Sequence, residues 1–273
     1  MDIATVNGVE LEYEVVGSGE PVLLISPVLP DGFLPLMTES ALTDRYQLIR
    51  YHKRGWVGST RTAGPVAVAD HVADAAALLH HLGVLCAHVA GHSSGAAVAA
   101  QLSLDHASTV RTLVLLELSL LSVPSGEAFF AQAGPAFEDY GAGDHEGAIA
   151  SFLGVVSGLD SATTRTVLED LLPGAFAQSV KDADTLFGVE LPGLAEWGFG
   201  AEQAAAIECP VLSMLGSGTQ PLWVDVAAFL RSSLPHVDEC TIDGVGHLLH
   251  IEQPEPVARA IASFLGRHPI TDR

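Results

Sequence analysis

The chain has 273 residues, of which 48% are hydrophobic and 16% are charged, so it can bury a large core and is not expected to be disordered. Its formal net charge of −21 opposes binding to nucleic acid and to anionic membrane surfaces. The 3 cysteines are odd in number and widely spaced, which argues against a disulfide framework and a zinc site. The N-terminus lacks the basic and apolar regions of a signal peptide, so we expect a cytoplasmic protein.

The first 60 residues are predicted to contain strands. Apolar or alternating runs, bounded by turn residues, fall at 2–5, 10–16, 21–26 and 47–51. The third run contains four consecutive apolar residues from Val22 to Ile25. Such a run is typical of a central strand in a parallel sheet that is covered on both faces.

Helical and strand-like segments alternate after residue 65. Apolar residues recur at helical spacing from Val66 to Leu82, and Gly83 follows as a C-cap. Further strands are predicted at 88–90, 112–116, 210–215 and 239–242, with helices at 96–104 and 254–265. This order predicts an α/β fold with a mostly parallel sheet and helices on both faces.

The alternation stops between residues 120 and 207. This segment is predicted to form short helices separated by Gly and Pro, and it contains seven of the ten phenylalanines together with Trp197. We therefore predict a core formed by 1–119 and 208–273 and a helical cap formed by 120–207. Aromatic cap residues indicate an apolar substrate pocket, with Trp197, Phe199 and Phe129 as candidate lining residues. Burial of these aromatics for stability alone is the alternative.

The segment Gly91-His92-Ser93-Ser94-Gly95 joins a predicted strand to an Ala-rich helix. A sharp turn of this kind strains the backbone of its serine, so the residues two positions away on either side must lack side chains. The helix N-terminus offers free N–H groups to a developing oxyanion. We predict Ser93 as a nucleophile and Ser94 as a backbone N–H donor; a Gly/Ser turn without chemistry is the alternative.

A serine nucleophile needs a base within hydrogen-bond reach. The Gly-rich loop 243–247 follows the last predicted strand, so His247 can point over the carboxyl edge of the sheet. His250 is the alternative in this loop. Solvated or structural roles are expected for the histidines in helical patterns, which are His71, His80, His81 and His106.

The elbow at Ser93, the loop from Gly244 to Pro254 and the run Y-H-K-R-G-W-V-G-S at 51–59 resemble the α/β-hydrolase superfamily over nearly the whole chain. The resemblance implies an α/β-hydrolase fold with an eight-stranded sheet and a helical cap inserted after the sixth strand. It also implies a serine-histidine-acid triad that needs no metal or cofactor. Esterases, lactonases, C–C bond hydrolases and non-enzymatic receptors all occur in this superfamily.

The position of the triad acid departs from the usual family pattern. Relatives usually carry it after the seventh strand, where the segment 216–220 has no carboxylate. We predict that Glu117, at the end of the sixth strand, replaces it, because some superfamily members place the acid there. Asp225 is the alternative acid, and a solvent-facing or salt-bridged role is the alternative for Glu117. The G-x-S-S-G elbow with this Glu is similar to zearalenone lactone hydrolases and their bacterial relatives.

Two further departures affect the loops around the site. Ser26 and Pro27 stand where relatives have His-Gly, and Pro27 has no N–H to donate. The predicted oxyanion hole therefore uses the amides of Val28 and Ser94. His52 stands where relatives usually have Asp, and the sequence offers no functional reason for it.

These features predict a serine hydrolase that cleaves a carboxylic ester or lactone of an apolar small molecule through an acyl-enzyme on Ser93. A C–C bond (diketone) hydrolase with the same triad and a ligand-binding receptor with a vestigial triad are the alternatives. Epoxide hydrolases and dehalogenases need a carboxylate nucleophile, which disfavours both. We expect a monomer or a homodimer without cofactor or metal.

Overall fold

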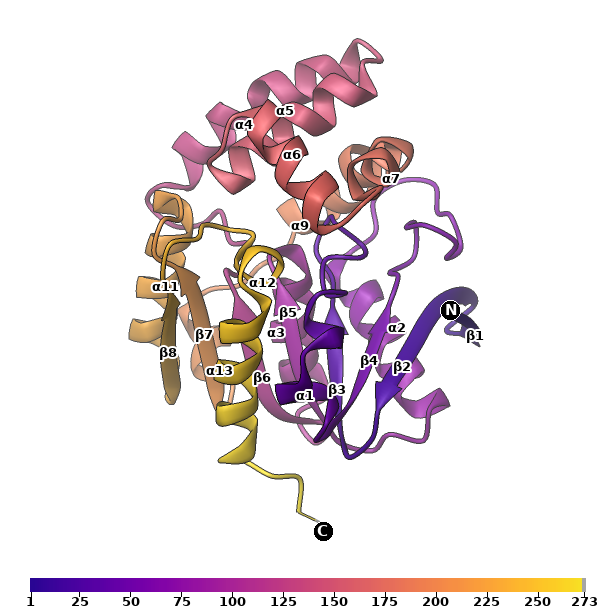
Figure 1. Cartoon of the computed structure of the whole chain (residues 1–273), viewed down its shortest axis with the longest axis vertical. Helices are drawn as coiled ribbons and strands as arrows, with labels where there is room; N and C mark the ends of the chain where they lie inside the picture. Colours follow the sequence, from indigo (N-terminus) through magenta and orange to yellow (C-terminus); the bar gives the residue numbers. More distant parts are fainter. Residues whose placement is uncertain (272–273) are drawn as a thin grey trace.

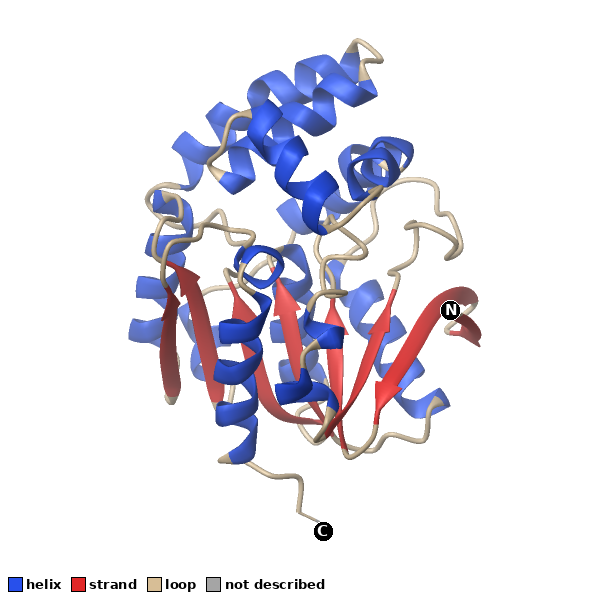
Figure 2. Cartoon of the chain, viewed as in Figure 1, coloured by secondary structure: helices blue, strands red, loops and turns tan. Residues whose placement is uncertain are grey.

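The computed structural model describes residues 1–271. Within this range the chain forms one eight-stranded sheet of order β1-β2-β4-β3-β5-β6-β7-β8. The strands are β1 (Asp2–Val6), β2 (Val9–Gly17), β3 (Glu20–Ile25), β4 (Tyr46–Tyr51), β5 (Ala87–His92), β6 (Val110–Leu116), β7 (Val211–Gly216) and β8 (Val237–Ile242). Strand β2 pairs antiparallel with its neighbours, and all pairs from β4 to β8 are parallel (Figure 2). The predicted α/β architecture with an eight-stranded, mostly parallel sheet is confirmed.

Helices cover both faces of the sheet. One face packs against α2 (Val68–His81), α3 (Ser94–Asp105) and α11 (Pro221–Ser233). The other face packs against the 3-10 helix η1 (Leu36–Thr38), α1 (Ser40–Thr43) and α13 (Pro254–Gly266), which follows α12 (Leu249–Glu252). Each predicted segment ends within two residues of its observed bounds, whereas the short helices at 36–43 were not predicted.

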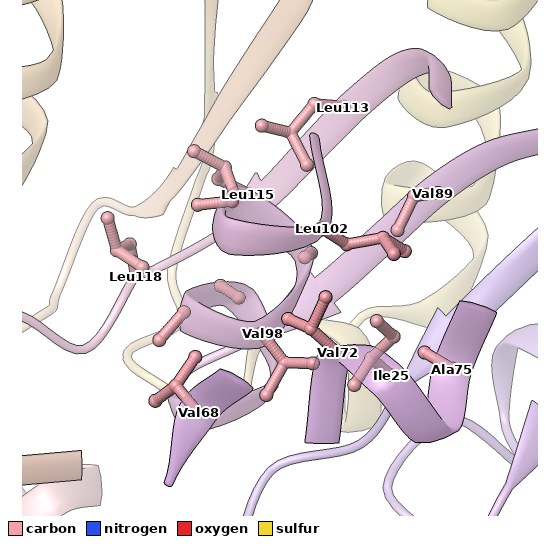
Figure 3. Packing of buried hydrophobic residues seen from close by; sticks show 14 of the residues in the cluster. Ile25, Val68, Val72, Ala75, Val89, Val98, Leu102, Leu113, Leu115 and Leu118 are labelled. Carbon is pink, nitrogen blue, oxygen red and sulfur yellow. The ribbon is translucent and has the colours of Figure 1, made fainter. Parts of the chain in front are cut away.

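The alternation of side chains along the central strands explains their continuous apolar sequence. Leu113 and Leu115 of β6 pack in the same buried cluster as Val98 and Leu102 of α3 (Figure 3). Val114, between them in sequence, belongs to the core on the opposite face. Because successive strand residues face opposite sides, a strand with helices on both sides needs apolar residues at every position.

A layer of helices lies above the carboxyl ends of the parallel strands, and its chain runs from the end of β6 to the start of β7 (Figure 1). Its elements are α4 (Gly126–Gly141), α5 (His145–Ser157), α6 (Ser161–Leu171), α7 (Ala175–Lys181), α8 (Ala183–Thr185), the π-helix η2 (Leu186–Glu190), α9 (Leu191–Ala195) and α10 (Ala201–Ala205). All of them fall inside the segment 120–207, which we call the cap. Among the described residues, no helix combines the length and the apolar character that crossing a membrane requires.

Candidate active site

The turn at Ser93 has the strained geometry of a nucleophile elbow. Ser93 lies between β5 and α3 with φ 54° and ψ −118°, a backbone conformation that residues other than glycine rarely adopt. A Cβ atom at Gly91 would collide with the carbonyl of Gly95, and one at Gly95 would collide with the carbonyl of Ile25. The two glycines therefore allow the sharp turn, for the steric reason that the sequence indicated.

The side chains of His247 and Glu117 meet in the interior beside this elbow. Nδ1 of His247 lies 2.7 Å from Oε2 of Glu117, and each residue is only 3% exposed. The Glu117 carboxylate also accepts hydrogen bonds from the amide of Gly216 at 2.8 Å and from Thr219 Oγ1 at 2.9 Å. The loop after β7 lacks an acid of its own, but it supplies donors that hold the acid placed after β6.

Burial controls the protonation of this pair. It raises the pKa of the Glu117 carboxyl to about 7, although the hydrogen bonds from Gly216 and Thr219 oppose the change. It lowers the pKa of the His247 imidazole to about 3. The rise in the pKa of Glu117 and the fall in the pKa of His247 have one cause, because the charged form of each group loses its contact with water. His247 therefore stays neutral near pH 7, as a general base must.

Two aromatic neighbours fix the plane of the His247 ring. Trp223 of α11 stacks on it with ring centroids 4.0 Å apart and an interplanar angle of 12°. The His92 ring lies 4.4 Å away, and its Nε2 is 2.9 Å from the His247 carbonyl oxygen. Sequence reasoning missed both contacts, because neither residue stands in a motif that indicates stacking on the base.

The alternative base and the alternative acid have other surroundings. His250 is fully buried, with its ring 4.2 Å from that of His92 and 5.1 Å from that of Phe33. Asp225 lies in α11 and accepts a hydrogen bond from the amide of Ser125 at 3.0 Å. The contact between His247 and Glu117 therefore favours these two residues over His250 and Asp225.

The elbow opens into a cavity of about 390 Å³ between the sheet and the cap. Ser93, His247 and the two predicted oxyanion donors, Val28 and Ser94, all belong to its wall. Ser94 is the first residue of α3, and the first amides of a helix have no acceptor within the helix. The remaining wall is mostly apolar and includes Leu29, Leu120, Leu121, Phe129, Phe130, Phe137, Phe152, Leu153, Val156, Leu191, Leu194, Trp197 and Trp223.

Two of the three predicted pocket residues of the cap line this cavity, and the third does not. Phe129 and Trp197 are part of the wall. The prediction for Phe199 is wrong, because its ring stacks on Trp197 at 4.8 Å and packs in the core beside Phe229. Phe130, Phe137 and Phe152 line the cavity instead, and their helical segments alone did not indicate which face would meet it.

The position of His52 has a structural explanation. Its Nδ1 lies 2.8 Å from Glu12 Oε2, and its Nε2 lies 3.1 Å from Asp31 Oδ1. Arg50 donates to the same Asp31 oxygen at 2.6 Å. The hydrogen bond from His52 and the nearby Arg50 hold the pKa of Asp31 below its usual range. His52 therefore holds the loop after β3 through Asp31, which lies three residues beyond Val28.

Within residues 1–271 we find no cluster of three or more His, Cys, Asp or Glu side chains placed to hold a metal ion. No charged side chain is present among the described residues that line the cavity. The side chains that meet at the site supply a hydroxyl, an imidazole and a buried carboxylate.

Comparison with known proteins gives a family match and partial relatives. Residues 29–254 match the family model described as the alpha/beta hydrolase fold. Over 108 residues the chain is 36% identical to a putative carbamate hydrolase, RutD, from Azorhizobium caulinodans. That match covers 39% of this chain and only 40% of the relative.

Solved structures match over nearly the full length. A thermophilic esterase from Thermogutta terrifontis has a TM-score of 0.77 at 25% identity, with 98% of this chain and 99% of that chain covered. A meta-cleavage product hydrolase from Pseudomonas fluorescens IP01 has a TM-score of 0.77 at 18% identity, with 98% of each chain covered. At the lower identity the likeness shows a shared fold only.

Proposed function

The chain belongs to the α/β-hydrolase fold family, and we propose that it is a serine hydrolase that cleaves a carboxylic ester or lactone of an uncharged, apolar small molecule. The observation that carries the proposal is the 2.7 Å contact between His247 and Glu117 beside the strained turn at Ser93. Ser93 and His247 line one apolar cavity, and Glu117 contacts His247 in the interior. The three residues match the roles of a nucleophile, a base and an orienting acid.

In the proposed reaction, Ser93 Oγ attacks the substrate carbonyl while His247 takes the hydroxyl proton. The amides of Val28 and Ser94 stabilise the oxyanion, and Glu117 stabilises the imidazolium that forms. His247 then protonates the leaving alcohol. Water attacks the acyl-enzyme with His247 as base, which releases the acid and restores Ser93.

The cavity wall favours an uncharged substrate. A carboxylate or ammonium group on the substrate would lose its hydration there without meeting an opposite charge. The relative from Azorhizobium caulinodans is named a putative carbamate hydrolase, and a carbamate in its anionic form would meet no opposite charge on this wall. Large aromatic surfaces such as Phe152 and Trp197 instead complement a bulky apolar acyl or alcohol group.

A substrate panel tests the proposal. It contains p-nitrophenyl esters of increasing chain length, aromatic lactones, a neutral vinylogous diketone, and each aromatic ester in a matched carboxylate-bearing form. We expect turnover of neutral esters or lactones that disappears in Ser93→Ala, with kcat/KM at least about tenfold higher for the neutral member of each pair. The lactones probe the predicted similarity to zearalenone lactone hydrolases.

The alternatives give different results in the same panel. Turnover confined to the diketone would replace the ester proposal with a C–C bond hydrolase, because the same triad serves both reactions. A stoichiometric adduct on Ser93 without release would indicate a receptor. Equal kcat/KM for neutral and carboxylate-bearing esters would contradict the substrate class inferred from the cavity wall.

The pH dependence of the reaction follows from the buried pair. Burial raises the pKa of Glu117 to about 7, so the pair takes up one proton as the pH falls through this range. A protonated pair no longer provides a free base held by a carboxylate, and kcat/KM should therefore fall below about pH 7 with a slope of one proton.

The variant Glu117→Gln provides the control for this profile. It has no carboxyl group to take up the proton, so its residual kcat/KM should not fall as the pH drops through about 7. A wild-type profile that stays flat down to pH 5 would contradict the assignment.

A further inference from the structure

A buried carboxylate of the cap contacts the residue next to the nucleophile. Glu190, the last residue of η2, is 3% exposed and accepts a hydrogen bond from Ser94 Oγ at 2.6 Å. The same carboxylate accepts a hydrogen bond from Trp56 Nε1 at 2.6 Å and forms an ion pair with Lys53. Lys53 Nζ also lies 3.5 Å from Ser94 Oγ. The four side chains form one buried polar cluster.

The members of this cluster come from separate parts of the chain. Lys53 and Trp56 belong to the segment after β4, Ser94 begins α3, and Glu190 belongs to the cap. Burial acts to raise the pKa of Glu190, but the Lys53 cation and the hydrogen bonds hold it below its ordinary value. The cap therefore presents an ionised acceptor to Ser94.

We propose that Glu190 is a positioning residue for the oxyanion hole: by holding the Ser94 hydroxyl, it aligns the Ser94 amide and makes this alignment depend on the docked cap. The inference rests on the proposed function, in which that amide stabilises the oxyanion. Preorganised donors stabilise a transition state because they need no reorganisation during the reaction. A hydroxyl held by an ionised carboxylate keeps the start of α3 in one position, since such hydrogen bonds are stronger than neutral ones.

A second ion pair between the cap and the core provides a matched control. Asp182, directly before α8, accepts hydrogen bonds from Arg61 Nη2 at 2.6 Å and from the Val57 amide at 3.3 Å. This pair joins the cap to the same segment of the core as Lys53 and Trp56, but its partners do not include Ser94. Asp182→Asn therefore removes another ion pair between the cap and the core while it leaves the contact between Glu190 and Ser94 in place.

The test compares two double variants, Lys53→Met/Glu190→Gln and Lys53→Met/Glu190→Leu. Both remove the buried charges together, because a lone buried Lys or Glu would be strongly destabilising whereas joint replacement is often tolerated. Glutamine keeps a polar partner for the Ser94 hydroxyl, and leucine does not. Both variants thus lose the buried charges, but only the glutamine variant keeps a hydrogen-bond partner, the tether, for the Ser94 hydroxyl.

With a p-nitrophenyl ester that the wild type turns over, the leucine variant should lose at least about tenfold in kcat with little change in KM. This loss is smaller than the roughly 100- to 1000-fold cost of removing an oxyanion donor outright. The glutamine variant and Asp182→Asn should stay within about threefold of the wild type. Thermal unfolding of each variant separates effects on stability from effects on kcat.

A mutant cycle with Ser94→Ala keeps the proposal testable if the leucine variant does not fold. Ser94→Ala retains the amide but loses the tether, so its kcat should fall by a factor similar to that of the leucine variant. Adding Lys53→Met/Glu190→Leu to Ser94→Ala should then cost nothing further, because the coupled contact is already gone.

The outcomes separate this inference from the proposed function. Equal kcat for the leucine and glutamine variants, or an unchanged kcat in Ser94→Ala, would overturn the positioning role and leave the hydrolase proposal standing. A wild type without any Ser93-dependent turnover would overturn the proposed function and this inference with it.

Discussion

Ser93→Ala is expected to lower kcat by about 10⁶, because it removes the atom that forms the acyl-enzyme. The fold should persist, since the backbone bonds of the elbow do not involve the side chain. The Ser93 amide donates to the Leu116 carbonyl at 3.0 Å, and its carbonyl accepts from the Ser119 amide at 3.1 Å. Steady-state turnover of the best ester, together with thermal unfolding, measures both expectations.

A second serine of the same helix serves as the control. Ser103, buried in α3, donates to the Ala100 carbonyl at 2.7 Å and does not line the cavity. Ser103→Ala should retain the wild-type kcat, so a loss confined to Ser93→Ala would point to chemistry rather than to a damaged helix. Full turnover by Ser93→Ala would refute the nucleophile assignment.

The parts of the site that local rules determine could be predicted from the sequence. The turn at Ser93 needs glycine at 91 and 95 for steric reasons, and this requirement appears as a five-residue motif. Glu117 could be predicted from the family resemblance, because the segment 216–220 has no carboxylate and some superfamily members place the acid after the sixth strand. The prediction paired it with His247, and the structure places the two side chains in hydrogen-bond contact.

The parts that depend on docking of the cap could not be predicted in this way. Glu190 and Lys53 are 137 positions apart, and their contact forms because η2 lies over the segment after β4. Trp197 and Phe199 belong to a non-helical stretch between α9 and α10, so no periodicity indicates which ring faces the cavity. Their assignment requires the tertiary arrangement of the cap, which the aromatic content alone does not encode.

Glu117→Gln is expected to lower kcat by about 10⁴, the cost of losing the carboxylate that orients a catalytic histidine. Glutamine can still accept from the Gly216 amide and bond to Thr219, so the fold should survive. The loss then arises from the contact with His247, because an amide can neither stabilise the imidazolium as an anion does nor enforce the same tautomer. Measurements at pH 8, above the acid limb, separate this effect from protonation.

Asp225→Asn is the comparison that decides where the acid resides. Its carboxylate caps the Ser125 amide, and an asparagine oxygen can keep that hydrogen bond. The variant should therefore retain kcat within about threefold. A large loss in Asp225→Asn with a small loss in Glu117→Gln would move the acid to α11. The expected ranking would instead show that the loop after β7 serves catalysis through the donors of Gly216 and Thr219, which hold an acid supplied by the neighbouring strand.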